Sequence, residues 1–202
     1  MPGPTGVRAR SYVNIYISKR RLRIGTLAQI LSSLWLITCS LIAAQVANRK
    51  RRIPRKEFLG LGLPRLIPSL ILMTGFIALA CALEVAYRHA GLGVTASWVG
   101  KYSWGALAIR IIGIVVLAPL GEELLFRGVI FQLLAPKSTA LAVLITAAFF
   151  AGFHIQYSWI GMALVFIDGL YFGLARAWSG STLLTIIMHC AGNAFAVYQR
   201  LH

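Results

Sequence analysis

Residues 118–128 read Ala-Pro-Leu-Gly-Glu-Glu-Leu-Leu-Phe-Arg-Gly and lie between two apolar runs, Ile111–Leu117 and Val129–Leu134. The chain has only five acidic residues, and two of them lie in this stretch. At membrane depth an ionised carboxylate costs roughly 2.5–3.5 kcal/mol even on the mildest insertion scale. Charged residues in such surroundings therefore belong to a functional site or are paired with one another.

Helix geometry separates the roles of these charges. Glu123 and Arg127 are spaced i, i+4 with the acid first, which favours an ion pair on one helix face. Glu122 lies about 100° further round the helix. We therefore expect Glu123 and Arg127 to neutralise each other and Glu122 to remain available for chemistry. The alternative is that all three charges form one buried structural network.

The composition indicates a membrane protein. Hydrophobic residues make up 58% of the 202 residues and charged residues 12%, whereas soluble domains have about 45–50% and about 25%. Gly25–Ala47 contains no charged residue and is long enough for a spanning helix, which needs about 20 apolar residues. We predict an all-α, polytopic transmembrane bundle with the active-site residues in its interior.

The apolar runs predict about six spans and three regions: a basic N-terminal arm at 1–24, two accessory spans with a basic loop at 25–104, and a catalytic core at 105–202. A continuous helix over residues 105–135 would be about 45 Å long, too long for one upright span. We expect Pro119 to end or kink it just before the glutamates. The predicted spans are 25–47, 66–87, 105–135, one ending near 154, one starting after 158, and 182–201.

The formal net charge of +15 is concentrated near the N-terminus. Thirteen of the 20 basic residues precede residue 66, in clusters at Arg8–Arg23 and Arg49–Arg65 that flank the first apolar run. Basic clusters beside spans orient helices and contact anionic lipid. We therefore expect the bilayer, with anionic lipid near these clusters, to be a partner, and we expect no nucleic-acid partner. The sequence makes no prediction of oligomeric state.

Two pairs of polar or aromatic residues recur inside later apolar runs. Phe150 and His154 are spaced i, i+4, and so are His189 and Asn193, so each pair shares a helix face. A lone histidine on an apolar face is more often a packing residue. Together with the free Glu122, these residues predict a polar site inside the bundle.

Asp168 is a further carboxylate within an apolar run. We expect it to have a structural role, paired with Arg176 or Arg110. Gly169 and Gly173, which follow it, form a small-xxx-small pair typical of closely packed helices.

Three motifs occur in a fixed order: Glu-Glu-x-x-x-Arg at 122–127, Phe-x-x-x-His at 150–154 and His-x-x-x-Asn at 189–193. This ordered set resembles the CAAX protease and bacteriocin-processing family of intramembrane endopeptidases, and in particular the type II CAAX prenyl endopeptidases. The resemblance covers roughly residues 105–195. It implies hydrolysis of a peptide bond in a membrane-associated peptide or protein, by a multi-pass protein that we place in the plasma membrane of a prokaryote.

The residue types are suited to that chemistry. Hydrolysis needs an activated water and donors for the developing oxyanion. We expect Glu122 to be the general base, His154 to help bind or deprotonate the water, and His189 and Asn193 to donate to the oxyanion. Glu123 and Arg127 would support the motif helix.

Three alternatives stay open. A divalent metal such as zinc could be held by Glu122, His154 and His189, because two histidines and a glutamate are a known catalytic zinc set. The same buried polar residues would also suit a transporter or channel, although no internal repeat is present. A catalytically silent scaffold or immunity protein is the third. A cysteine nucleophile is disfavoured, because Cys39, Cys81 and Cys190 all lie within apolar runs and outside any nucleophile motif.

Overall fold

The computed structural model describes residues 5–89, 98 and 100–201, and all the regular structure in these residues is helical. The helices are α1 (Thr5–Arg51), α2 (Arg55–Phe58), α3 (Leu66–His89), α4 (Trp104–Ile112), α5 (Ala118–Glu123), α6 (Phe131–Leu134), α7 (Thr139–Gly152), α8 (Trp159–Ser179) and α9 (Thr182–Leu201), with π-helical segments η1 (Gly113–Leu117) and η2 (Leu124–Ile130). The predicted all-α class is confirmed.

Within the described residues, four helical stretches are long and apolar enough to cross a membrane: Ile24–Lys50, Leu66–Ala86, Trp104–Leu134 and Trp159–Ser179. Helix α7 is apolar but shorter. Helix α9 occupies the sixth predicted span, and its strongly polar His189 and Asn193 make it less apolar than these four. The protein is therefore a membrane protein, built from the six helical stretches that the apolar runs predicted.

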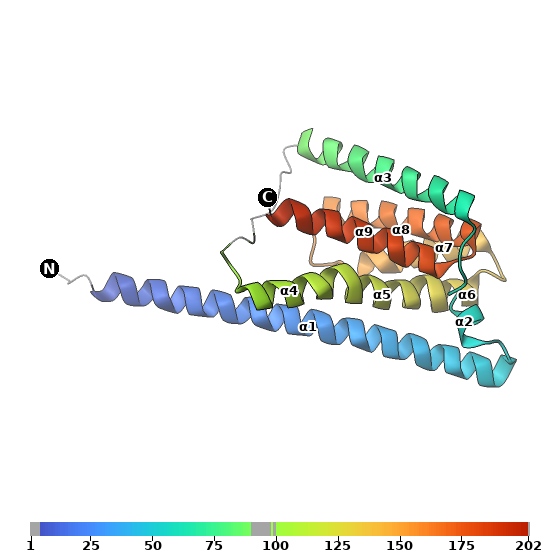
Figure 1. Cartoon of the computed structure of the whole chain (residues 1–202), viewed down its shortest axis with the longest axis horizontal. Helices are drawn as coiled ribbons and strands as arrows, with labels where there is room; N and C mark the ends of the chain where they lie inside the picture. Colours follow the sequence, from blue (N-terminus) through green and yellow to red (C-terminus); the bar gives the residue numbers. More distant parts are fainter. Residues whose placement is uncertain (1–4, 90–97, 99, 202) are drawn as a thin grey trace.

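The helices are stacked in layers around the α4–α6 helix (Figure 1). Helix α1 runs along one side of it, α7, α8 and α9 lie on the other, and α3 covers α8 and α9 from outside. Many large apolar side chains of α1 and α3, such as Trp35 and Leu70, are exposed on the outside of this stack, as expected of surfaces in contact with lipid. The central helix, which carries Glu122, is therefore covered on two sides by protein.

The basic N-terminal arm is helical from its fifth residue. Helix α1 already begins at Thr5 and continues without interruption into the first span. Residues 7–24 contain neither Gly nor Pro and include many Arg and Lys, which have high helix propensity. The Gly-rich stretch 89–103, for which the sequence predicts a loop, lies in part outside the described residues, at 90–97 and 99.

Pro119 does not end the central helix, which was one of the two outcomes that we predicted for it. The stretch from Trp104 to Leu134 is continuous, with Pro119 near the start of α5 and the two π-helical segments on either side of α5. A π-helical segment shifts the hydrogen-bond register by one residue. That shift accommodates the proline without a break in the helix.

Close packing of α7 against α8 places the second motif beside the first. A Cβ atom on Gly169 would lie 3.0 Å from Ala147 Cα, and one on Gly173 would lie 3.0 Å from Val143 Cγ1. These glycines therefore allow the backbones to approach, as the small-xxx-small pair predicted. Helix α8 then ends at Gly180, which has a φ of 70°. Ser181 Oγ accepts a hydrogen bond from the Leu184 N–H at 3.4 Å and so caps the start of α9.

Candidate active site

The two adjacent glutamates lie at the C-terminal end of α5, between the π-helical segments. Such segments are rare and frequently occur at functional sites. Here they also free a backbone carbonyl. The Ala118 N–H bonds to Gly113 O, five residues back, and Pro119 has no N–H to offer. Ile114 O therefore has no donor at i+4 or i+5.

Asn193 fills this gap from α9. Its Nδ2 donates to Ile114 O at 2.8 Å. We expected Asn193 to serve only as an oxyanion donor, but one of its two amide hydrogens is committed to this carbonyl. The contact joins α9 to the glutamate helix at the point where the proline interrupts the hydrogen-bond ladder, and it leaves the second amide hydrogen available.

Glu123 and Arg127 form the expected ion pair, with 2.9 Å between Arg127 Nη1 and Glu123 Oε1 and both side chains fully buried. Arg127 Nη2 also donates to Gly169 O at 2.9 Å, which joins the motif helix to α8. The guanidinium carbon lies 4.7 Å from the Phe150 ring centroid and 5.4 Å from that of Phe172. Such cation–π contacts are worth about 2 kcal/mol or more when desolvated.

Glu123 has a second partner that the sequence did not indicate. His189 Nδ1 lies 3.0 Å from the same Glu123 Oε1. An ionised carboxylate only accepts hydrogen bonds, so Nδ1 carries a proton and donates it. The other ring nitrogen, Nε2, then faces Glu122 Oε2 across 3.9 Å. Glu123 thus fixes both the tautomer and the direction of the histidine ring, in addition to pairing with Arg127.

His154 lies just beyond the end of α7, and its Nδ1 is 2.8 Å from Phe150 O. Because a carbonyl accepts, Nδ1 is the protonated nitrogen, and Nε2 keeps its lone pair. The Phe150 ring packs against both histidines, with centroid distances of 5.0 Å to His154 and 5.5 Å to His189. The Phe150 ring therefore contacts both imidazoles and restricts their positions.

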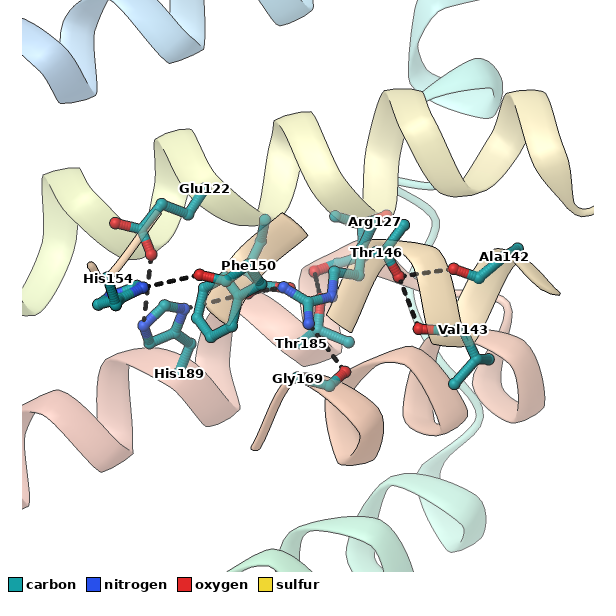
Figure 2. Close-up of polar contacts among 12 residues, drawn as sticks. Glu122, Arg127, Ala142, Val143, Thr146, Phe150, His154, Gly169, Thr185 and His189 are labelled. Carbon is teal, nitrogen blue, oxygen red and sulfur yellow. Dashed lines mark hydrogen bonds and ion pairs between the residues drawn. The ribbon is translucent and has the colours of Figure 1, made fainter. Parts of the chain in front are cut away.

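Glu122, His154 and His189 thus gather in one place, as Figure 2 shows. Glu122 Oε2 is buried and has no hydrogen-bond partner among the described residues. His154, His189 and Asn193 all line a cavity of about 750 Å³ between α3, α8 and α9. The two histidines line this space, whereas Glu122 lies beside His189 and is not among the lining residues.

The predicted metal ligands do not form a metal-binding arrangement. In the part of the chain that the structure describes, no three His, Cys, Asp or Glu side chains are grouped so that they could hold a metal ion. The bond from His189 Nδ1 to Glu123 leaves Nε2 directed at Glu122 Oε2, 3.9 Å away, an orientation that metal-binding histidines also have. The three predicted ligands together do not form a group that could hold a zinc ion.

Asp168 is not paired as we expected. Arg176 instead donates to Arg127 O and to Gln132 Oε1, both at 3.2 Å, and Arg110 donates to Thr26 Oγ1 at 3.0 Å. Asp168 lines the same cavity as the two histidines. We predicted a cationic partner from the cost of a charge within an apolar run, and the sequence does not show that this side of the helix faces a cavity.

Two residues at the site were missed by sequence reasoning. Phe172 stacks on His189 with a centroid distance of 5.3 Å, and Arg176 holds the carbonyl of Arg127 from α8. The spacing of Asp168, Phe172 and Arg176 at successive i, i+4 positions is the one signal that could have found them, because it places them on one face of α8.

Part of the chain is similar to known proteins. Residues 103–195 match the family described as Rce1-like, type II CAAX prenyl endopeptidase. An uncharacterized 24.3 kDa protein of Escherichia coli is 35% identical over 85 residues, which make up 40% of this chain and 39% of that protein. The chain therefore covers about two fifths of this relative's length. No solved structure matches.

Proposed function

We propose that this chain, whose residues 103–195 match the Rce1-like type II CAAX prenyl endopeptidase family, is a membrane endopeptidase that activates water with Glu122 and the two histidines. The observation that carries the proposal is the 3.9 Å gap between Glu122 Oε2 and His189 Nε2. A water molecule within hydrogen-bond reach of both atoms would bridge them without moving either side chain, because it can donate to Glu122 and accept from His189 Nε2–H when that ring carries two protons.

In the proposed reaction Glu122 takes a proton from the water, and the resulting hydroxide attacks the scissile carbonyl carbon. His154 accepts a hydrogen bond from the same water through Nε2, because its Nδ1–H is directed at Phe150 O. Protonated Glu122 then gives its proton to the leaving amine nitrogen as the C–N bond breaks. The general acid–base part of such a mechanism contributes about 10²–10⁴-fold to rate.

The developing oxyanion needs preorganised donors. His189 can donate from Nε2 when its ring carries two protons, and Glu123 supports that charged form through the 3.0 Å bond to Nδ1. The second amide hydrogen of Asn193 is the other candidate, and the Ile114 contact holds that amide in place. We therefore assign Glu123 a positioning role in addition to its pairing with Arg127.

The natural substrate class that we propose is a membrane-associated peptide or protein, processed at a CAAX-type C-terminus or at a leader of the bacteriocin type. The apolar walls of the cavity, including Phe76, Leu164 and Phe172, support a substrate that approaches from the bilayer. The Escherichia coli relative supports a location in a prokaryotic plasma membrane. We also propose that anionic lipid headgroups contact the basic clusters at either end of the first span.

Purified protein in liposomes, offered a panel of membrane peptides that includes prenylated C-termini and leader peptides, tests this function. We expect new C-termini detectable by mass spectrometry, each carrying one labelled oxygen when the reaction is run in heavy-oxygen water. Cleavage should survive a chelator, and serine- and cysteine-directed reagents should spare it. If no peptide is cleaved but a solute crosses the liposome membrane in a Glu122-dependent way, the protein is a transporter and the proposal fails.

A further inference from the structure

We infer that Asp168 is a specificity-determining residue that binds the side chain of a lysine or arginine close to the scissile bond of the substrate. This inference rests on the proposed function and adds a chemical preference to it. Asp168 is the only aspartate in the chain, and it lines the cavity that also holds His154, His189 and Asn193.

The Asp168 side chain is directed toward the cavity, because Asp168 lies on the face of α8 that lines it. The α8 residues that line the cavity are Gly161, Leu164, Val165, Asp168 and Phe172. Their spacings of three and four residues define one continuous helix face. The cavity-facing stripe of α8 is thus apolar except for one carboxylate at its centre.

The carboxylate has no hydrogen-bond or ion-pair partner among the described residues. The two arginines that we expected to pair with it bind elsewhere, Arg176 to the carbonyl of Arg127 and Arg110 to Thr26. Arg127 and His189 act on it only through their electrostatic field, and both are already bound to Glu123. Of the other acidic groups in the cavity wall, Glu84 is already paired with Arg88. Asp168 is therefore the lining carboxylate available to a cation that enters with the substrate.

Asp168 also lies at the right distance from the reaction centre. Phe172, one helical turn away, stacks on His189, and one turn is about 5.4 Å. An extended peptide advances about 3.3 Å per residue. A peptide whose scissile carbonyl lies beside His189 would thus bring a side chain one or two residues away to Asp168.

The surroundings favour recognition of charge. Apolar side chains of α8 such as Leu164 and Phe172 flank the half-buried carboxylate, so an ammonium or guanidinium gains more from it than it would at a fully exposed site. A neutral side chain at the same place would leave the carboxylate desolvated and unpaired, which disfavours that substrate. A hydrogen bond to a charged group in such a site corresponds to roughly a 10- to 100-fold preference.

The test uses the purified protein in liposomes and the best-cleaved peptide of the panel. Its N-terminus is acetylated so that no α-ammonium is present. Lysine, acetyl-lysine or norleucine is placed at each position one or two residues from the scissile bond. We expect the wild type to cleave one lysine peptide roughly 10- to 100-fold faster, in kcat/KM, than its acetyl-lysine counterpart. Asp168→Asn should bring the lysine to acetyl-lysine ratio of kcat/KM to about one, with little change in kcat/KM for the acetyl-lysine peptide. Asp168→Glu should retain part of the ratio. Cys81→Ser, on the α3 side of the cavity, should keep the full ratio.

Three outcomes would overturn the inference. A wild type that cleaves lysine and acetyl-lysine peptides equally has no charge preference, and this result does not depend on whether any variant folds. An Asp168→Asn protein that loses activity equally on both peptides would show that Asp168 acts through His189. Retention of the full ratio by Asp168→Asn would assign the preference to another residue. If no peptide of the panel is cleaved at all, the proposed function fails first, and the two failures are distinguishable.

Discussion

Replacement of Arg127 by alanine should destabilise the protein far more than the same replacement of an arginine in an exposed ion pair. The Arg127 side chain is fully buried and donates to Glu123 and to the Gly169 carbonyl, each at 2.9 Å. Its removal leaves the Glu123 carboxylate buried without its cation. Breaking a buried pair in this way costs about 3–5 kcal/mol. His189 remains as a second partner of Glu123, so we expect a loss near the lower end, about 3 kcal/mol.

Thermal unfolding in detergent measures the effect. For a chain of this size, about 3 kcal/mol corresponds to a fall in Tm of roughly 6–12 °C. Arg88→Ala is the matched control, because Arg88 also pairs with a glutamate at i, i+4, but its side chain is 59% exposed. Exposed pairs contribute about 0–1 kcal/mol, so that variant should shift Tm by only a few degrees.

A double variant separates the loss of the pair from the loss of packing. Arg127→Met combined with Glu123→Gln removes both charges and keeps an acceptor for His189, so it should be more stable than Arg127→Met alone. The reasoning is refuted if Arg127→Ala lowers Tm no more than Arg88→Ala does. It is also refuted if the double variant is less stable than Arg127→Met alone.

Further predictions concern the proline gap, the second histidine and the free thiol. Asn193→Leu should lower the free energy of unfolding by about 1–3 kcal/mol, because it leaves the Ile114 carbonyl without a donor. Pro119→Ala restores a backbone N–H and should recover part of that loss in a thermal double-mutant cycle. If the effects of the two substitutions are strictly additive, the role assigned to the Asn193–Ile114 bond is wrong. His154→Ala should abolish cleavage with Tm nearly unchanged, and a variant with normal kcat would remove His154 from the mechanism. Cys190→Ala should cleave normally, because Cys190 does not line the cavity. If thiol reagents inhibit the wild type and Cys190→Ala removes that inhibition, the nucleophile is not water.

The sequence predicts much of this structure because each signal involved is local. Apolar runs give the helices, since a span must satisfy its backbone groups internally. The i, i+4 spacing of Glu123 and Arg127 gives their ion pair, and Gly169 and Gly173 mark the close approach of α7 and α8. Within one helix, periodicity fixes which side chains share a face.

Contacts between helices could not be predicted in the same way. Periodicity gives neither the rotation of a helix about its axis nor its neighbours. The bond from His189 to Glu123 therefore went unnoticed, and Asp168 was assigned cationic partners that it does not have. Pro119 was expected to end or kink the helix, which does not end there. Local rules do not indicate that a π-helical segment would absorb the missing N–H, with Asn193 supplying the donor from a distant helix.

The most direct test of the central claim is the kcat of Glu122→Gln on a cleaved peptide, measured with the purified protein in liposomes. The substitution is nearly isosteric and removes the base while leaving the Glu123–Arg127 pair intact. If Glu122 activates the water, kcat should fall by roughly 10²–10⁴-fold while Tm stays close to that of the wild type. A folded Glu122→Gln protein that retains kcat within a few-fold of the wild type would contradict the assignment of Glu122 as the base.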